Sequence, residues 1–362
     1  MAKILNVAII GLGRIAKHHI NEITNNKNYK LVSVSDLNFK RLKEIKNKYR
    51  VEGYRDFDEM LSIHHNIDLV SIMTPSGMHY EHAKKIITKF KKNIVLEKPT
   101  CLKIKHLENL YYFAKKYKTR IFPVFQNRYN LSVQRVKKSI TSGEIGKIRI
   151  ISVAVRWCRP QRYYNLSKWR GTFSHDGGAL TNQGIHHIDL IRYLGGEIKN
   201  ISCKMSTLGA KIEVEDTVVG HFEFEKNNAV GSLEITTCAR PIDFEATISV
   251  IGSKGIAKIS GIAANKLNFF SLNQKECKKN SEFFYNVYGN GHKKFYIDLE
   301  KSINNNTKFP VSEKDCINTI KFLHAFYLSN YKSKKISFSK VHDFYRLGEK
   351  NEKISKLYRY QK

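Results

Sequence analysis

The chain is 362 residues long, with 41% hydrophobic and 26% charged residues, proportions that are usual for a soluble globular protein. Single hydrophobic cores stop growing near about 250 to 300 residues, so we expect two domains. No apolar run approaches the roughly 20 residues needed to cross a bilayer, so no membrane span is expected, and no membrane partner is predicted.

The charge balance is strongly basic, with 63 Lys and Arg against 32 Asp and Glu and a net charge of +31. Such a balance is typical of proteins that bind nucleic acid or an anionic membrane surface. Here the lysines are spread along the chain among many Asn and Ile residues, without a nucleic-acid-binding motif, so we expect solvated lysine-rich faces and no nucleic-acid partner. Attraction of anionic ligands, including phosphate-bearing small molecules, is the alternative.

Two features indicate a cytoplasmic protein. The N-terminal run MAKILNVAIIGLG continues into a glycine-rich turn rather than a small-residue cleavage site, so it is interpreted as a first core strand and not as a signal peptide. The cysteines are scattered without a CxxC pair, which argues against a zinc site or a disulfide framework and for a reducing compartment. These cysteines are Cys101, Cys158, Cys203, Cys238, Cys277 and Cys316.

The first third of the chain alternates β-branched runs with helical spacing of apolar residues. Strict alternation of strand and helix predicts a doubly wound parallel sheet, here over residues 1–125. Strands are predicted at 4–10, 30–36, 67–73, 92–98 and 119–125, and helices at 14–25, 39–49, 78–90 and 103–117.

From about residue 147 the pattern changes to strand-like runs joined by tight turns such as EKNN and GSKG. This predicts a mainly antiparallel sheet, so the second domain, residues 126–340, belongs to the α+β class. Helical character returns near 180–194, 293–303 and 313–331, while the charged residues 341–362 are expected to form a frayed or disordered tail.

A glycine motif, GLGRIA, lies between the first predicted strand and the first predicted helix. The first glycine permits a tight turn, the second lets backbone amides approach a pyrophosphate, and Ala16 lets helix and strand pack closely at a helix N-terminus that faces the anion. In this context the motif predicts a dinucleotide site. The motif residues expected to contact the cofactor are Gly11, Gly13, Arg14 and Ile15.

The choice of dinucleotide depends on Asp36, which ends the second predicted strand. A carboxylate at that distance accepts hydrogen bonds from the adenosine ribose hydroxyls and repels a 2′-phosphate, which favours NAD over NADP. Lys40 and Arg41 follow closely and weaken that preference, so NADP stays open.

Three further segments accompany the glycine motif: TPSGMHYEHA (74–83), LEKPT (96–100) and GGALTNQGIHHIDL (177–190). The first two follow predicted strands at the sheet edge where ligands of such folds bind. All four motifs, in this order over nearly the whole chain, resemble the glucose-fructose oxidoreductase, inositol dehydrogenase and rhizopine-catabolism (Gfo/Idh/MocA) family.

The resemblance implies a Rossmann domain and a C-terminal open antiparallel sheet whose outer face commonly forms dimers or tetramers. It implies a nicotinamide cofactor and a sugar or cyclitol substrate that is oxidised or reduced at a carbinol carbon. It also implies a peptide bond before Pro99 that is often cis. The implied cofactor contacts are Thr74, Pro75, Ser76, His79, Glu97, Lys98 and Gln126, and Asn127 and Arg128 would contact the substrate.

Oxidation of an alcohol needs a base or a cationic stabiliser within hydrogen-bond reach of the hydroxyl oxygen. A partly desolvated lysine beside a positively charged nicotinamide could take or give that proton. Alone, Lys98 would be interpreted as a surface lysine, but its place in the EKP motif makes it a catalytic candidate.

The stretch TNQGIHHIDL (181–190) is expected to be helical, which places Asn182 and His186 on one face, with Asp189 close to it. A core histidine satisfied by a carboxylate is the alternative from the residues alone. No HExxH or comparable cluster is present, so no metal is expected. The resemblance assigns catalysis to His186, with Asp189 orienting it or holding the helix and His187 pointing elsewhere.

The substrate prediction depends on Asn182, because many sugar and inositol dehydrogenases of the family carry aspartate there and an amide cannot be a general base. Together with YYNLSKWRGT (163–172) and HDGGAL (175–180), this resembles the subgroup that oxidises C3 of nucleotide-linked amino sugars such as UDP-N-acetylglucosamine or its uronate, in surface-glycan synthesis. Alternatives are a free-sugar or inositol dehydrogenase, a nucleotide keto-sugar reductase and a non-catalytic regulator.

The same resemblance implies further site residues. Trp169 and Arg170 would pack against the nicotinamide or the sugar, and Tyr163 and Tyr164 could bound the sugar pocket. Arg128, Arg156 and Arg170 could serve an anionic group. Remaining substrate contacts are expected from Asn182, Gln183 and His292.

Overall fold

The computed structural model describes residues 3–284 and 288–361. The chain divides into two compact units, and each is assembled from separate stretches of sequence. The first unit comprises Met1–Val124, His292–Ile317 and Lys350–Lys362, and the second comprises Phe125–Gly291 and Asn318–Glu349.

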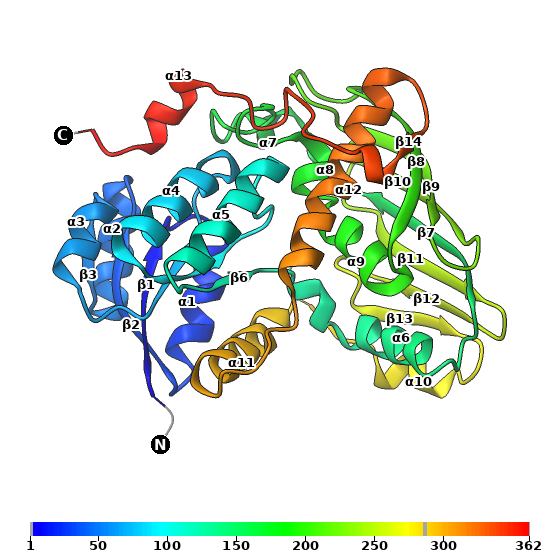
Figure 1. The fold of residues 1–362 in the computed structure, drawn as a ribbon, viewed down its shortest axis with the longest axis horizontal. Coiled ribbons are helices and arrows are strands. Elements are labelled where there is room, and N and C mark those ends of the chain that lie inside the picture. The colour runs from blue at the N-terminus through cyan, green and yellow to red at the C-terminus, as the bar shows by residue number, and fades with distance from the viewer. Residues whose placement is uncertain (1–2, 285–287, 362) are drawn as a thin grey trace. The chain divides into compact units, whose positions relative to one another are not determined.

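The first unit is a doubly wound parallel sheet covered by helices (Figure 1). Its described strands follow the order β3-β2-β1-β4-β5-β6, and every pairing between them is parallel. Because helices cover both faces of such a sheet, its strands are almost continuously buried, as in LNVAII of β1. The elements are β1 (Leu5–Ile10), α1 (Ala16–Thr24), β2 (Tyr29–Ser35), α2 (Phe39–Tyr49), β3 (Glu52–Tyr54), α3 (Phe57–Ile63), β4 (Leu69–Ile72), η1 (Ser76–Met78), α4 (His79–Lys85), the π-turn η2 (Ile86–Phe90), β5 (Asn93–Leu96), α5 (Ile104–Lys116) and β6 (Ile121–Pro123).

Two late segments complete the first unit. Helix α11 (Gly291–Asn304) packs on β2, where the Tyr29 hydroxyl donates to the Tyr296 carbonyl at 2.6 Å. The segment after α11 is held by the Arg120 guanidinium, which donates to the Thr307 carbonyl at 3.2 Å. The last segment contains α13 (Glu352–Ser355) and η5 (Lys356–Tyr358). The expected boundaries of 126–340 and 341–362 therefore differ from the structure, which gives 292–317 and 350–362 to the first unit.

The second unit is built on a mixed sheet in the order β13-β12-β11-β7-β10-β9-β8-β14, in which β7 and β10 are parallel and the other described pairs are antiparallel. The predicted fold class is confirmed. The elements are η3 (Gln126–Tyr129), α6 (Leu131–Thr141), β7 (Ile148–Arg156), α7 (Gln161–Tyr164), α8 (Gly178–Asn182), α9 (Ile185–Gly195), β8 (Ile198–Ser206), β9 (Thr217–Phe224), β10 (Val230–Thr236), β11 (Glu245–Gly252), β12 (Ile256–Ser260), β13 (Lys266–Phe270), α10 (Lys275–Lys279), α12 (Glu313–Lys332), β14 (Ile336–Ser337) and η4 (Phe338–Lys340).

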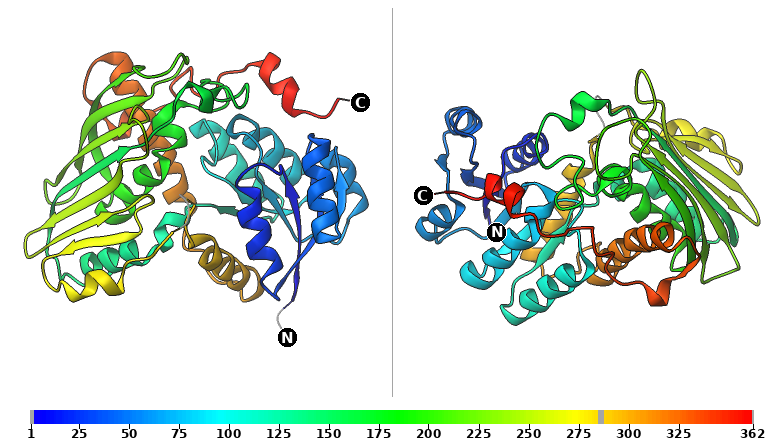
Figure 2. Two further views of the ribbon diagram at one scale, coloured as in Figure 1. Left: turned by 180° about the vertical axis from the view of Figure 1, so that it is seen from behind. Right: turned by 90° about the horizontal axis from the view of Figure 1, so that it is seen from above.

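The two faces of this second sheet differ, because buried and more exposed positions alternate along β9, β10 and β11. The inner face packs on helices: Phe222 lies against Phe322 of α12, with ring centroids 5.5 Å apart. Figure 2 shows the helices of this unit gathered on that one side of the sheet. The outer face carries the intermediate and exposed positions.

The predicted elements and the observed ones differ in several places, and helix α6 is one that the sequence pattern did not predict. The short strand β3 and helix α3 were not anticipated, because Glu52–Tyr54 is three residues long and lacks an apolar run. The expected helix 180–194 is divided into α8 and α9 at Gln183 and Gly184. The tail expected to be frayed has helical turns within the first unit.

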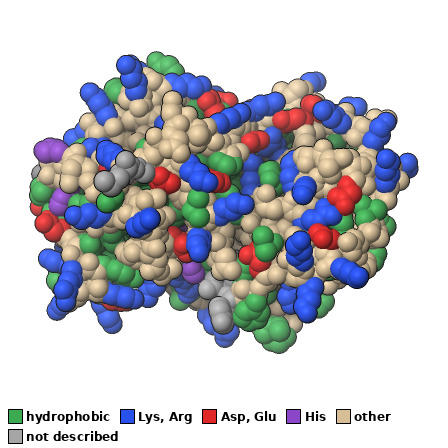
Figure 3. Space-filling view, turned by 90° about the horizontal axis from the view of Figure 1, so that it is seen from below, with side chains coloured by type: hydrophobic (Ala, Val, Ile, Leu, Met, Phe, Trp, Pro, Cys, Tyr) green, Lys and Arg blue, Asp and Glu red, His purple; other side chains and the backbone are tan. Residues whose placement is uncertain are grey.

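Lysine and arginine side chains are spread over the face seen in Figure 3, interleaved with acidic and neutral ones. This distribution favours the interpretation of the charge as solvated lysine-rich faces. Along the described residues, no helix combines the length and apolar character that crossing a membrane requires.

Gly231 tests the packing between the inner face of the sheet and its buried aromatic residues. A Cβ at this position would lie 2.2 Å from the Phe222 ring and 2.7 Å from the Ile151 carbonyl oxygen. Gly231→Ala is expected to lower the free energy of unfolding by about 1 to 3 kcal/mol, as overpacking does. Denaturant unfolding measures it, with Ser232→Ala on the exposed face as the control. Equal free energies of unfolding for Gly231→Ala and Ser232→Ala would contradict the close packing of Gly231 against Phe222.

Candidate active site

The turn between β1 and α1 has the conformation that the glycine motif predicts. Gly11 has φ +88°, and a Cβ there would lie 2.8 Å from the Met73 carbonyl, so only glycine fits. At Gly13 a Cβ would meet nothing within 4 Å, which leaves the backbone open to a ligand. Together with the N-terminus of α1, the turn fits the pyrophosphate of a dinucleotide.

Asp36 lies at the end of β2 beside this turn. Its Oδ2 accepts from the Leu12 backbone N–H at 2.6 Å, and its Oδ1 accepts from the Asn38 N–H at 2.7 Å. These two bonds hold the carboxylate at the mouth of the glycine turn, where it can accept from ribose hydroxyls. Arg14 is exposed and Ile15 half-buried in the same turn.

The loops that follow β4 and β5 are joined through His79. Its Nε2 lies 2.9 Å from the Thr74 carbonyl oxygen and its Nδ1 lies 2.8 Å from the Pro99 carbonyl oxygen. Burial lowers the pKa of His79, although its hydrogen bonds to these carbonyls oppose the effect. Both ring nitrogens of this buried side chain contact backbone, so His79 braces the loop that carries Thr74, Pro75 and Ser76. Its predicted role of lining the cofactor stays a prediction.

Glu97 is a buried carboxylate at the end of β5. Its Oε1 lies 2.9 Å from His19 Nε2, and its Oε2 accepts from the Lys98 backbone N–H at 3.0 Å. Burial alone would raise the pKa of Glu97, but the interactions with His19 and His292 hold it well below its ordinary value. Glu97 thus remains ionised and fixes the backbone of Lys98. The Lys98–Pro99 peptide bond is cis.

His292, on α11, belongs to the same cluster. Its Nε2 lies 3.9 Å from Glu97 Oε1, and its ring packs edge-on against His19 with centroids 4.8 Å apart. His292 is 2% exposed. The ring contacts Glu97 and His19 within the first unit, and the predicted substrate contact stays a prediction.

Among the described residues, His19, Glu97 and His292 form the one group whose ligand atoms could hold a metal ion, all within 4.8 Å of one another. Both oxygens of Glu97 already accept hydrogen bonds, and His19 Nδ1 also bonds the Tyr296 hydroxyl at 2.8 Å. A hydrogen-bonded carboxylate accounts for this geometry, and the absence of a metal cofactor stays a prediction.

In the second unit, α8 and α9 carry the TNQGIHHIDL stretch. The helices are separated at Gly184, where a Cβ would lie 2.4 Å from Ile235 of β10, so the chain presses closely on the sheet. His186, in the first turn of α9, is 8% exposed, and its Nε2 lies 3.3 Å from the Gln126 side-chain amide nitrogen. Asn127, in the same turn as Gln126, is also buried.

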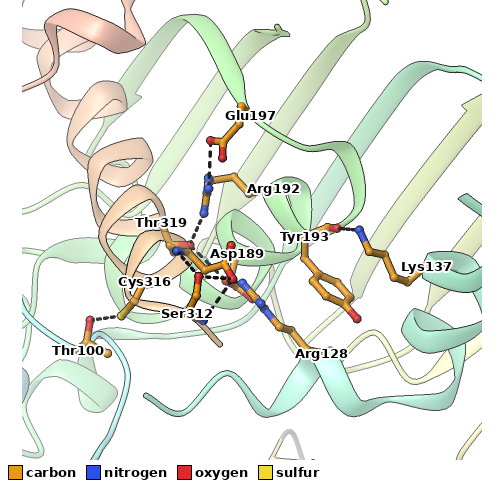
Figure 4. Close-up of polar contacts among 11 residues, drawn as sticks. Thr100, Arg128, Lys137, Asp189, Arg192, Tyr193, Glu197, Ser312, Cys316 and Thr319 are labelled. Atoms are coloured by element: carbon orange, nitrogen blue, oxygen red, sulfur yellow. Dashed lines mark hydrogen bonds and ion pairs between the residues drawn. The ribbon is translucent and has the colours of Figure 1, made fainter. Parts of the chain in front are cut away.

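Arg128 and Asp189 form a buried bidentate ion pair (Figure 4). Arg128 Nε and Nη2 donate to the two Asp189 oxygens at 2.7 Å each, and the Thr319 hydroxyl donates to Asp189 Oδ1 at 3.2 Å. Of the two roles predicted for Asp189, this geometry fits holding helix α9, through Arg128. The Arg128 charge is neutralised by Asp189, and its predicted contacts with the substrate and with an anionic group stay predictions.

Arg156 is another arginine predicted to serve an anionic group, and that role stays a prediction. It ends β7 on the outer face of the sheet, where its guanidinium donates to Glu234 at 2.5 Å and also bonds Glu245. Two carboxylates therefore neutralise its charge, and it lies opposite the face that packs on α8 and α9.

Asp176 is a buried carboxylate that the sequence did not single out. Its Oδ2 accepts from the Gly171 N–H at 2.7 Å, and its Oδ1 accepts from the Asn182 side-chain amide. Asp176 thereby ties the loop of Trp169 and Arg170 to α8 and orients the Asn182 amide. Asp176 lies in the HDGGAL motif, which entered only through the resemblance to the nucleotide-sugar subgroup.

Tyr163, Arg170 and Gln183 form a second cluster beside α8. The Arg170 guanidinium bonds the Tyr163 hydroxyl and lies 4.3 Å from that ring's centroid, and Gln183 Nε2 donates to the same hydroxyl at 3.3 Å. The Arg170 guanidinium also lies 4.7 Å from the Trp169 ring centroid. Tyr164 is buried instead, with its hydroxyl 3.0 Å from Thr237 Oγ1.

A hollow of about 370 Å³ opens next to this cluster. Three cationic side chains, Lys168, Arg170 and Lys211, line it with one acidic side chain, Glu213. Its other lining residues are Gln161, Tyr164, Asn165, Ser167, Gly171 and Ile212.

Two family models match the chain. Residues 5–125 match an oxidoreductase family with an NAD-binding Rossmann fold, and residues 133–258 match the GFO/IDH/MocA C-terminal domain. The chain belongs to the Gfo/Idh/MocA family. Among its relatives, a myo-inositol 2-dehydrogenase of Thermotoga maritima is 28% identical over 259 residues, covering 69% of this chain and 74% of the relative, and the uncharacterised oxidoreductase YrbE of Bacillus subtilis is 24% identical over 325 residues, covering 87% and 91%.

Solved structures of family members extend the similarity over the whole fold. The WlbA dehydrogenase of Bordetella pertussis, in complex with NADH and UDP-GlcNAcA, has a TM-score of 0.87 and 28% identity, covering 92% of this chain and 98% of that one. The WlbA of Chromobacterium violaceum, with the same ligands, has a TM-score of 0.86 and 28% identity, covering 93% and 96%. This Gfo/Idh/MocA member is an NAD-dependent oxidoreductase, which its glycine turn and Asp36 fit.

Asp176→Asn tests the tie between the Trp169–Arg170 loop and α8. Because both oxygens of Asp176 accept hydrogen bonds, an amide in its place directs an N–H at a donor and leaves it unsatisfied. We expect a loss of about 1 to 3 kcal/mol in the free energy of unfolding, measured by denaturant titration. The matched control, Asp298→Asn on α11, should change little, and equal effects in both variants would contradict the assignment.

His187→Leu tests the burial of the second histidine. His187 is fully buried with neither ring nitrogen hydrogen-bonded to any described residue, and burial lowers its pKa to about 4. Because unfolded His187 takes up a proton below about pH 6.5, the folded protein loses stability as the pH falls from there to about 4, by about 3 kcal/mol in total. The free energy of unfolding is measured by denaturation at several pH values. In His187→Leu it should fall by about 3 kcal/mol less than in the wild type between pH 6.5 and 4. The same pH dependence of stability in the wild type and in His187→Leu would refute the role of buried His187.

Proposed function

We propose that this protein oxidises the C3 hydroxyl of a nucleotide-linked amino sugar, UDP-N-acetylglucosamine or its uronate, with NAD as the hydride acceptor. The similarity to WlbA dehydrogenases over nearly the full length of both chains carries the proposal. The product would be a 3-keto sugar, consistent with a cytoplasmic step of surface-glycan synthesis.

The reaction removes a hydride from the carbon and a proton from its hydroxyl. Bound NAD supplies the hydride acceptor, and this chain must supply the group that takes the proton. Lys98 and His186 are proposed for that role, since one follows β5 on a backbone held by Glu97 and the other opens α9 beside Gln126. Both side chains have a nitrogen that can accept a proton when neutral.

Asn182 supports a substrate different from that of the inositol dehydrogenases. The Asn182 amide donates to the buried Asp176. Many relatives carry a carboxylate at position 182, whereas here the nearest carboxylate is hydrogen-bonded to the Asn182 side chain. An amide can orient a sugar hydroxyl but cannot remove its proton. This leaves the proton to Lys98 and His186.

The hollow beside Arg170 supports an anionic substrate. Of the three arginines considered for that role, Arg128 and Arg156 are neutralised by carboxylates, whereas Arg170 lines a hollow with Lys168 and Lys211. An excess of positive charge in a hollow attracts phosphate or carboxylate groups. A nucleotide diphosphate or a uronate would meet that requirement.

Homo-oligomer formation through the outer face of the second sheet is also proposed. Val219 on β9 and Val230 on β10 are 55% and 47% exposed on this sheet, as an apolar contact surface would require.

The test is a comparison of substrates. Purified protein with NAD is incubated with UDP-N-acetylglucosamine, its uronate and myo-inositol, and reduction of the nicotinamide is followed by absorbance. We expect reduction with a nucleotide sugar. Turnover of inositol alone would overturn the proposal in favour of a free-sugar or inositol dehydrogenase. NAD binding without turnover in either direction would favour the non-catalytic regulator, and turnover only of the keto sugar with NADH would favour the reductase.

Lys98→Ala and His186→Ala test the two proposed catalytic groups. Each is expected to lower kcat by about 100-fold to 10,000-fold, the range that a positioned acid–base group contributes, while NAD binding is largely retained. Lys43→Ala and His65→Ala change exposed side chains of the first unit and should leave kcat unchanged. Full activity in either catalytic-site variant would refute the role of that residue.

A further inference from the structure

The last residues of the chain return to the first unit and are held there. Helix α13 begins at Asn351, whose side chain accepts from the Ile354 N–H at 3.1 Å and caps the helix N-terminus. Five of the thirteen residues 350–362 are Lys or Arg and one is Glu, so the segment is strongly cationic.

Arg359 anchors this segment to the cofactor half of the fold. Its Nε and Nη2 donate to the two oxygens of Glu81 at 2.7 and 2.6 Å, and its Nη1 donates to Glu352 at 2.7 Å. Glu81 lies in the first turn of α4, directly after the loop of Thr74, Pro75 and Ser76. A fork-to-fork pair of this kind fixes the orientation of the segment.

Tyr360 provides a second anchor, at the end of strand β3. The Arg55 guanidinium, just after β3, lies 5.7 Å from the Tyr360 ring centroid. In the sheet order β3-β2-β1-β4, the strands β2 and β1 lie between the two anchors. Those two strands lead into Asp36 and the Gly11–Gly13 turn. Figures 1 and 2 show the segment running along this carboxyl side of the sheet.

We propose that residues 350–361 form part of the NAD site, closing over the adenosine half of the dinucleotide and slowing its release. The anchors flank the residues that fit the pyrophosphate and the ribose, and the cationic segment complements a dianionic ligand. The Arg359–Glu81 pair is half-buried, with side chains 34% and 43% accessible, and Tyr360 is exposed, so the closure is weak enough to open. The proposal rests on NAD binding and not on the identity of the sugar.

Arg359→Glu tests the closure, because it places one negative charge beside the carboxylates of Glu81 and Glu352. The full-length protein is loaded with NADH, and its release on mixing with excess NAD is followed by the fluorescence of the bound nicotinamide. We expect release to become about threefold to tenfold faster, the range within which an exposed ion pair acts. Glu81→Arg combined with Arg359→Glu should restore slow release. Tyr360→Ala should also speed it.

The control is Lys335→Glu, which breaks an exposed ion pair with Glu223 in the second unit. It should release NADH at the wild-type rate. Limited trypsin digestion gives a second readout, since cleavage in residues 350–361 should slow when NADH is bound. Release unchanged in Arg359→Glu, or not restored by the charge exchange, would overturn the proposal, as would digestion that ignores NADH. Because no sugar is present, a failed substrate prediction leaves this result unaffected.

Discussion

The buried negative charge of Glu97 is the constraint around which the first unit is organised. A carboxylate removed from water must be compensated by hydrogen bonds, and its partners here come from distant parts of the chain. His19 comes from α1, directly after the glycine turn, the Lys98 N–H comes from the end of β5, and His292 comes from α11. One carboxylate therefore sets the position of the proposed catalytic lysine relative to the helix that faces the cofactor.

In the second unit, an ion pair compensates the buried carboxylate of Asp189. Arg128 and Asp189 neutralise each other in the interior, and each is held in a fork geometry that tolerates little rotation. Since Arg128 lies two residues after Gln126 and Asp189 three residues after His186, the pair fixes both elements that carry the Gln126–His186 contact. Arg128 and Asp189 thus hold the geometry of the site, and His186 is the group of the motif proposed for catalysis.

Much of the first unit could be predicted from sequence because its signals are local. The glycine turn, Asp36 and the β-branched strands each depend on residues close in the chain. The short β3 had no such signal, since its three residues pair with β2 through tertiary context. Contacts with partners distant in the chain could not be predicted from sequence. Arg156 contacts Glu234 and Glu245 only once the sheet has formed, and His292 contacts Glu97 only once α11 packs in the first unit.

The first unit is assembled from segments at both ends of the chain, and this constrains the order in which the two units can fold during synthesis. Its sheet is encoded before residue 125, yet the helix that supplies Tyr296 and His292 is encoded after residue 290, and its last segment ends the chain. A ribosome-bound chain that has released only its first third exposes the surface that α11 later covers. The second unit is largely translated before the first can bury that surface, so the domain that begins first is finished last.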